Sequence, residues 1–130
     1  MSLFRVNVVA VNPADETRRT APVEALVDTG SELTWLPADL LDAIGVQRRR
    51  QRSFSTATRQ AVTRDVGYAI LGAAGYETAD EVVFAESGDM ILLGVRTLEG
   101  FGVAVDNVAR RFAAQTTIVA GFLLRFRQHR

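Results

Sequence analysis

The residues of this sequence that could do chemistry are carboxylates, hydroxyls and arginines, and one carboxylate has a distinctive setting. Asp28 directly follows the strand-like run Val23–Val27 and precedes Thr29, Gly30 and Ser31. An ionised carboxylate at the end of a buried strand needs hydrogen-bond donors. Gly30 permits a turn whose backbone N–H faces back toward the acid, and the two hydroxyls are further donors. This spacing suits an acid held at the bottom of a cleft, although Asp and Gly also dominate ordinary turns.

Other catalytic chemistries have few residues to work with in this chain. It contains no Cys, and its single His, His129, is the penultimate residue. Thiol nucleophiles, thiolate metal sites and disulfides are therefore excluded, and a Ser-His-Asp triad or a His-based zinc site would depend on the chain end. We expect no metal and no cofactor, because the sequence has no metal-ligand cluster, phosphate loop or cofactor fingerprint.

The net charge points away from nucleic acid as a partner. Fifteen basic residues, all of them Arg, balance fifteen acidic residues in the 130-residue chain. The chain therefore has no long-range field that would attract nucleic acid. The run from 47 to 52 holds four arginines, and we expect it to be a solvated edge strand protected by charge rather than a phosphate-binding stripe.

The elements that would position Asp28 are mostly short β-strands. Residues 4–11 and 23–27 are rich in Val, and further apolar runs occur at 66–71, 82–85, 90–94 and 103–105. Two short helices are predicted, one from Leu36 to Gly45 and one from Val95 to Phe101. Trp35 is expected to pack in the core against the first helix rather than line a pocket. The length fits one domain, and the pattern predicts a mostly-β barrel or sandwich.

Two local motifs together resemble the retroviral-type aspartic proteases (retropepsins), in particular their cellular and bacterial single-domain relatives. The first is Ala25–Ser31, followed by Leu33 and the helix, and the second is Ile91–Gly94. Those proteases have an apolar strand, Asp-Thr/Ser-Gly-Ala/Ser, a flap hairpin, and then two apolar residues and Gly opening a short helix. The resemblance covers residues 23–106. It implies a closed acid-protease-type barrel or sandwich with one lobe per chain, with residues 1–130 forming a single domain.

The resemblance also implies a role for each residue of the two motifs. Asp28 would be the catalytic carboxylate, and Thr29 would lock two such loops together across a dimer axis. Gly30 would direct backbone N–H groups toward the acid, and Ser31 would hydrogen-bond its outer oxygen. The structural loop behind the active site would be formed by Leu92, Leu93 and Gly94.

An enzyme of this type requires a second carboxylate. Aspartic proteolysis uses two acids that share one proton, one activating water and the other protonating the substrate carbonyl. The chain has one Asp-Thr-Gly, so the second Asp28 must come from another copy through a twofold interface. We therefore expect a homodimeric aspartic endopeptidase that acts on peptides or unfolded proteins. Residues 3–11 and 116–126 could pair into an intersubunit sheet, or the last strand could complete the barrel of its own chain.

A lid over the site would be a hairpin with its tip near residues 56–61, at Thr58, Arg59 and Gln60. Lids commonly use Gly, yet none lies between Gly45 and Gly67, which predicts a stiffer lid or none. The alternative function is therefore a non-catalytic module that keeps the fold and dimerises or binds extended peptide. A small β-barrel with an accidental Asp-Thr-Gly turn is the third possibility.

The start of the chain lacks the architecture of a signal peptide, and no apolar run reaches membrane-spanning length. From the sequence we expect a soluble, cytoplasmic domain that has no membrane partner.

Overall fold

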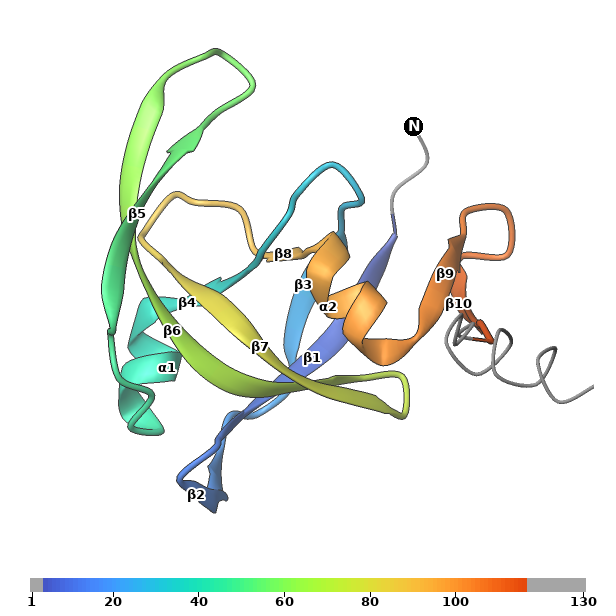
Figure 1. The fold of residues 1–130 in the computed structure, drawn as a ribbon, viewed down its shortest axis with the longest axis horizontal. Coiled ribbons are helices and arrows are strands. Elements are labelled where there is room, and N and C mark those ends of the chain that lie inside the picture. The colour runs from blue at the N-terminus through green and yellow to red at the C-terminus, as the bar shows by residue number, and fades with distance from the viewer. Residues whose placement is uncertain (1–3, 117–130) are drawn as a thin grey trace, which may run out of the picture.

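The computed structural model describes residues 4–116, which form ten strands and two short helices (Figure 1). The strands are β1 (Arg5–Asn12), β2 (Asp15–Arg19), β3 (Val23–Val27), β4 (Thr34–Pro37), β5 (Arg50–Ser55), β6 (Ala61–Ala73), β7 (Tyr76–Ala85), β8 (Leu92–Leu93), β9 (Val103–Asp106) and β10 (Arg111–Ala114). The helices are α1 (Ala38–Ala43) and α2 (Val95–Phe101). None of the helices in this described part of the chain is long and apolar enough to cross a membrane.

Eight strands form one sheet in the order β2-β1-β3-β8-β4-β7-β6-β5, and β9 and β10 form a separate pair. An additional β1–β6 pairing joins the two halves of the large sheet, so that its strands surround the core. The mostly-β class with two short helices is confirmed, but the sheet is not the clean closed barrel that was expected. The strands β2 and β5 stand at the two ends of the strand order and do not pair with each other, and the short β8 meets β4 at a single residue pair.

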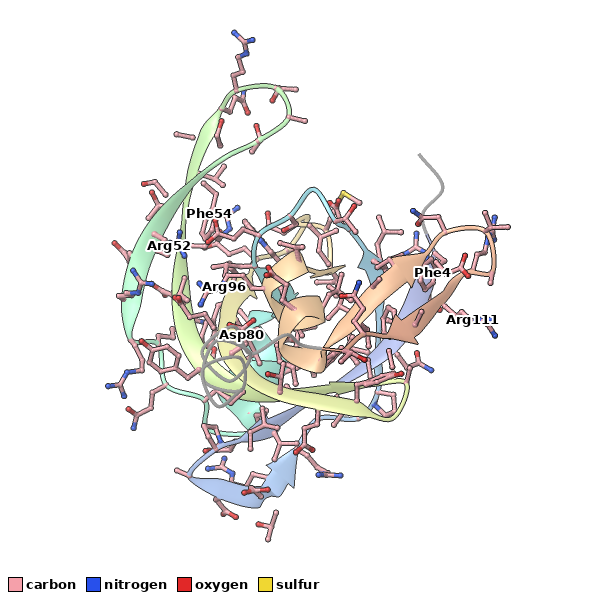
Figure 2. All side chains as sticks on the ribbon, turned by 45° about the vertical axis from the view of Figure 1, so that its right-hand side comes forward. Phe4, Arg52, Phe54, Asp80, Arg96 and Arg111 are labelled. Carbon is pink, nitrogen blue, oxygen red and sulfur yellow. The ribbon has the colours of Figure 1, made fainter. Side chains whose placement is uncertain are left out.

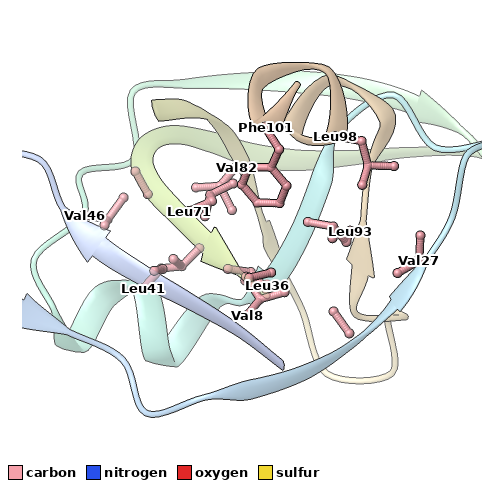
Figure 3. Packing of buried hydrophobic residues seen from close by; sticks show 14 of the residues in the cluster. Val8, Val27, Leu36, Leu41, Val46, Leu71, Val82, Leu93, Leu98 and Phe101 are labelled. Carbon is pink, nitrogen blue, oxygen red and sulfur yellow. The ribbon is translucent and has the colours of Figure 1, made fainter. Parts of the chain in front are cut away.

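The main core lies between the sheet and the two helices (Figure 3). Leu41 of α1 and Leu98 of α2 are buried against strand residues such as Leu71 and Leu93. Each fully buried side chain of this size contributes about 2 kcal/mol relative to an exposed one. This burial fixes both helices against the sheet, and it fixes the loops that begin or end at them.

The first predicted helix begins later than expected. Leu36 and Pro37 belong to β4, where they pair in parallel register with Phe84 and Ala85 of β7, and α1 starts at Ala38. Cross-strand pairing of the buried Leu36 outweighs the helical spacing that the sequence offers. The predicted end is confirmed, because Gly45 has a positive φ of 81° two residues after the last residue of the helix.

The first strand pairs with three other strands of its own chain. β1 pairs with β3 over Arg5–Val8, with β6 over Val9–Val11, and with β2 at its end. In-chain pairing with β3 therefore takes up one edge of Arg5–Val8, and an intersubunit sheet that includes residues 3–11 stays a prediction. The predicted strand at 116–126 lies outside the described residues from 117 onward.

The hairpin turn between β6 and β7 uses an unfavourable residue. Ala74 and Gly75 form a two-residue turn between the paired Ala73 and Tyr76, with φ values of 51° and 85°. A turn of this type favours Asn-Gly, because Asn tolerates a positive φ better than Ala does. We expect Ala74→Asn to raise the free energy of unfolding by about 0.5–1 kcal/mol, measured by urea denaturation. A lower stability in this variant would contradict the assigned turn.

Candidate active site

Asp28 lies at the end of β3 in a turn that supplies hydrogen bonds to it. The Gly30 N–H donates to Asp28 Oδ1 at 2.9 Å, and the Ser31 N–H donates to the Asp28 carbonyl at 3.1 Å. A Cβ on residue 30 would lie 3.2 Å from Asp28 Oδ1, so glycine keeps this approach open. Asp28 is half-buried and Thr29 is exposed, which leaves the acid accessible from outside the chain. The predicted backbone donor is therefore present.

Ser31 does not play the part that the resemblance implied. Its hydroxyl donates to the Leu33 carbonyl at 2.8 Å, and not to the carboxylate of Asp28. The hydroxyl has one proton to donate, and the acid loop itself uses it. Ser31 therefore stabilises the loop between β3 and β4 (residues 28–33, the acid loop) rather than the outer oxygen of the acid.

The second motif lies directly behind the acid loop. Strand β8 runs parallel to β3, with Leu92 opposite Leu26 and Leu93 opposite Val27, and the Asp28 N–H donates to the Leu93 carbonyl at 3.0 Å. The two motifs are distant in the sequence, and the fold brings them into backbone contact.

Gly94 permits the close contact between the two motifs. A Cβ on this residue would lie 2.4 Å from both the carbonyl carbon and the carbonyl oxygen of Leu33. The following residues, Val95 and Arg96, donate their N–H groups to the carbonyls of Ser31 and Glu32 at 2.8 and 3.0 Å. The first turn of α2 thus satisfies its free donors on the acid loop, which fixes the loop in place.

A buried chain of hydroxyls continues from this contact and was not found from the sequence. The Gly94 N–H donates to Thr34 Oγ1 at 2.9 Å, and Thr34 Oγ1 lies 2.7 Å from Thr97 Oγ1. Thr97 Oγ1 donates in turn to Asp80 Oδ2 at 3.1 Å. Thr34 and Thr97 are completely buried, so each depends on these partners. Three elements far apart in sequence supply the chain, and no local spacing indicates it.

Trp35 packs away from the helix that was expected to cover it. Its ring meets Phe54 of β5 edge-on, with centroids 5.0 Å apart. Both rings cover a small second cluster formed by the buried Leu33, Val66 and Val83. The aromatic pair therefore joins β4, which directly follows the acid loop, to the part of β5 next to the tip of the β5–β6 hairpin.

The β5–β6 hairpin has its tip at the residues predicted for a lid. The Thr56 N–H donates to the Gln60 carbonyl at 2.8 Å, and the Arg59 N–H donates to the Thr56 carbonyl at 2.9 Å. Arg59 has a positive φ of 64° at the position where such three-residue turns favour Gly. In Figure 1 the hairpin projects from the body toward the same end of the molecule as the acid loop.

Asp89 makes the stability of the fold depend on pH. Hydrogen bonds from Arg64 hold the pKa of Asp89 below its usual range, and hydrogen bonds from Arg48 do the same for the pKa of Asp42. Such a carboxyl stabilises the fold above its unfolded pKa of about 4, and the contribution is lost as the pH falls through the folded pKa. We expect the free energy of unfolding to decrease between about pH 5 and pH 2, as measured by urea titration. An Asp89→Asn variant with the same pH dependence would contradict this.

Within residues 4–116, no group of three or more His, Cys, Asp or Glu side chains is arranged to hold a metal ion.

Comparison with protein families agrees with this geometry. Residues 18–100 match the family model described as "gag-polyprotein putative aspartyl protease". The match covers well over half of the chain and includes the acid loop, the hairpin and Leu92–Gly94. Among curated proteins, none matches the chain.

Proposed function

Because the chain belongs to the family of retroviral-type, gag-polyprotein aspartyl proteases, we propose that it is an aspartic endopeptidase that acts as a homodimer. The observation that carries the proposal is the seating of Asp28: a half-buried carboxylate, accepting a hydrogen bond from the Gly30 N–H, on a loop braced by β8 and α2. A rigidly held acid that remains accessible is what general acid–base catalysis requires.

The proposed reaction uses one Asp28 from each of two copies. One carboxylate takes a proton from water, which attacks the peptide carbonyl, while the protonated carboxyl of the other copy donates to the carbonyl oxygen. The proton taken from water then passes to the leaving amine as the C–N bond breaks, and one hydroxyl of the tetrahedral intermediate returns a proton to the other carboxylate, which restores the starting state. The exposed Thr29 beside Asp28 supports this arrangement, since a residue that joins two acid loops must be free on the surface of the single chain.

A mixing experiment tests the requirement for two acids. Wild-type chain is unfolded and refolded together with an equal amount of the Asp28→Asn chain, and cleavage of an unfolded protein is measured. We expect the activity per wild-type chain to fall to about half, because about half of these chains then sit in mixed dimers with one acid. Refolding with an equal amount of the Asp39→Asn chain is the matched control and should leave that activity unchanged.

If the activity per wild-type chain does not change on mixing with the Asp28→Asn chain, a single copy suffices and the paired-acid proposal is wrong. If wild-type chain forms dimers but cleaves nothing, the non-catalytic peptide-binding module is the better description. The observation that favours this second candidate is the tip of the hairpin, where Arg59 takes the place of a mobile glycine.

A further inference from the structure

The arginines before and within β5 form ion pairs with other elements, which their charge pattern in the sequence did not indicate. β5 is an edge strand of the sheet, as expected, but three arginines of the run from 47 to 52 are paired with carboxylates rather than only solvated. The guanidinium groups reach carboxylates on three different elements: Arg48 pairs with Asp42 of α1, Arg50 with Glu81 of β7, and Arg52 with Glu32 of the acid loop.

Arg52 has a counterpart directly across the hairpin. In the β5–β6 register Arg52 lies opposite Arg64, so the two side chains share one face of the sheet. Arg64 donates to Asp89 through two nitrogens, at 2.7 and 2.9 Å. Asp89 belongs to the loop between β7 and β8, which leads into Leu92. One strand of the hairpin is therefore held by an arginine to the acid loop, and the other is held by an arginine to the loop that leads into β8.

The two attachments differ in strength. The side chains of Arg64 and Asp89 are 15% and 18% exposed, and Asp89 also accepts a hydrogen bond from the Glu86 N–H at 2.8 Å. A bidentate pair shielded from water is a strong contact. The Arg52–Glu32 pair is 3.8 Å long and Glu32 is 61% exposed, which makes it weak and sensitive to salt.

Beyond this pair of arginines the hairpin contacts the body through Phe54, and its tip makes contacts within itself. Phe54, two residues after Arg52 on the same face, packs against Trp35, and Figure 2 shows Arg52 and Phe54 between the hairpin and the body. The tip is bonded within itself, through the Thr56–Gln60 backbone contact and a 3.1 Å contact between the hydroxyls of Thr56 and Thr58.

We propose that Arg52 and Arg64 are positioning residues that clamp the base of the β5–β6 hairpin between the acid loop and the β7–β8 loop. The clamp confines movement of the hairpin to residues 55–61 and sets where its tip lies relative to Asp28. The Arg64–Asp89 pair fixes the direction of the hairpin, and the Arg52–Glu32 pair limits how far it swings. That the tip covers a bound peptide rests on the proposed function, whereas the clamp itself rests on the contacts above.

The clamp is tested by measuring a distance in the full chain. Because the chain contains no Cys, Thr58→Cys at the tip and Glu99→Cys on the exposed face of α2 give two specific sites for spin labels. In this labelled background we expect Arg64→Gln to broaden the distance distribution by about twofold. Arg52→Gln should broaden it less, by about as much as raising the salt to about 1 M does in the parent.

Arg49→Gln is the matched control. Arg49 lies in the same run, but its guanidinium is placed over the Tyr68 ring at 5.5 Å. This substitution should leave the distance distribution unchanged. If Arg64→Gln fails to fold, Asp89→Asn is used in its place, since it keeps the shape of the acceptor and removes its charge.

Three outcomes are possible, and together they separate the clamp from the proposed function. If Arg64→Gln and Asp89→Asn give the same distribution as Arg49→Gln, the clamp is overturned whether or not the protein cleaves peptides. If the distances respond as expected and wild-type chain has activity, Arg64→Gln should raise KM by about 3- to 10-fold, with a smaller change in kcat. If the distances respond but the wild-type chain cleaves nothing, the clamp is supported and the proposed function fails.

Discussion

Replacement of Asp28 by Asn is expected to lower the rate of peptide cleavage by more than about 1,000-fold, because the variant can neither take a proton from water nor donate one to the substrate carbonyl. The fold should survive the change. Asp28 accepts the Gly30 N–H through Oδ1, and the amide oxygen of the variant can accept the same bond. The measurement is the cleavage rate of an unfolded protein, together with the urea midpoint and the dimer fraction of both proteins.

The control is the same chemical change at an acid outside the site. Asp39 is an exposed residue of α1 whose carboxylate accepts its neighbour's N–H, and Asp39→Asn should leave the rate unchanged. If the Asp28→Asn variant cleaves the unfolded protein at a rate close to that of the Asp39→Asn variant, Asp28 is not the catalytic residue. Loss of the fold in Asp28→Asn would instead contradict the structural argument about Oδ1.

Gly94→Ala is expected to destabilise the fold by about 2–4 kcal/mol. The added Cβ would lie 2.4 Å from the carbonyl carbon and oxygen of Leu33, and both are backbone atoms that cannot turn aside. Relief of the clash would separate α2 from the acid loop and weaken the bonds from Val95 and Arg96 to its carbonyls. Chemical denaturation measures the loss of stability, and the cleavage rate should fall with it.

Gly72→Ala is the matched control for that experiment. Gly72 lies in β6, and a Cβ there would be no closer than 3.5 Å to any of the neighbours it meets, the nearest being the carbonyl oxygen of Tyr76. We expect its stability to stay within about 0.5 kcal/mol of wild type. Equal stabilities of Gly94→Ala and Gly72→Ala would show that the contact between the two motifs is looser than the structure indicates.

The sequence predicted the parts of the site that depend on neighbouring residues. The strand before Asp28, the glycine turn that returns an N–H to it, and the helix from Val95 to Phe101 are all as expected. So is the position of the hairpin turn around Arg59. In each case the preference of a few adjacent residues settles the local conformation, so that a short pattern is sufficient.

The sequence did not predict the contacts of groups that have several possible partners. Ser31 has several acceptors within reach, and only the path of the acid loop decides that its proton goes to Leu33. The first strand pairs with β3, β6 and β2 of its own chain, and its Val-rich pattern does not indicate which partners it takes. The arginines near β5 look like a solvated run because their carboxylate partners lie on other elements.

By itself, then, the amino-acid order determined the local conformations around the acid and the mostly-β class of the fold. Tertiary structure alone decided which of the competing partners each group obtained: the hydroxyl chain from Thr34 to Asp80, the Trp35–Phe54 contact and the arginine clamp. The physical reason is the distance along the chain over which each kind of interaction acts. Backbone preferences act over a few residues, whereas hydrogen bonds, ion pairs and ring contacts form between whichever groups the packed chain brings within a few ångströms.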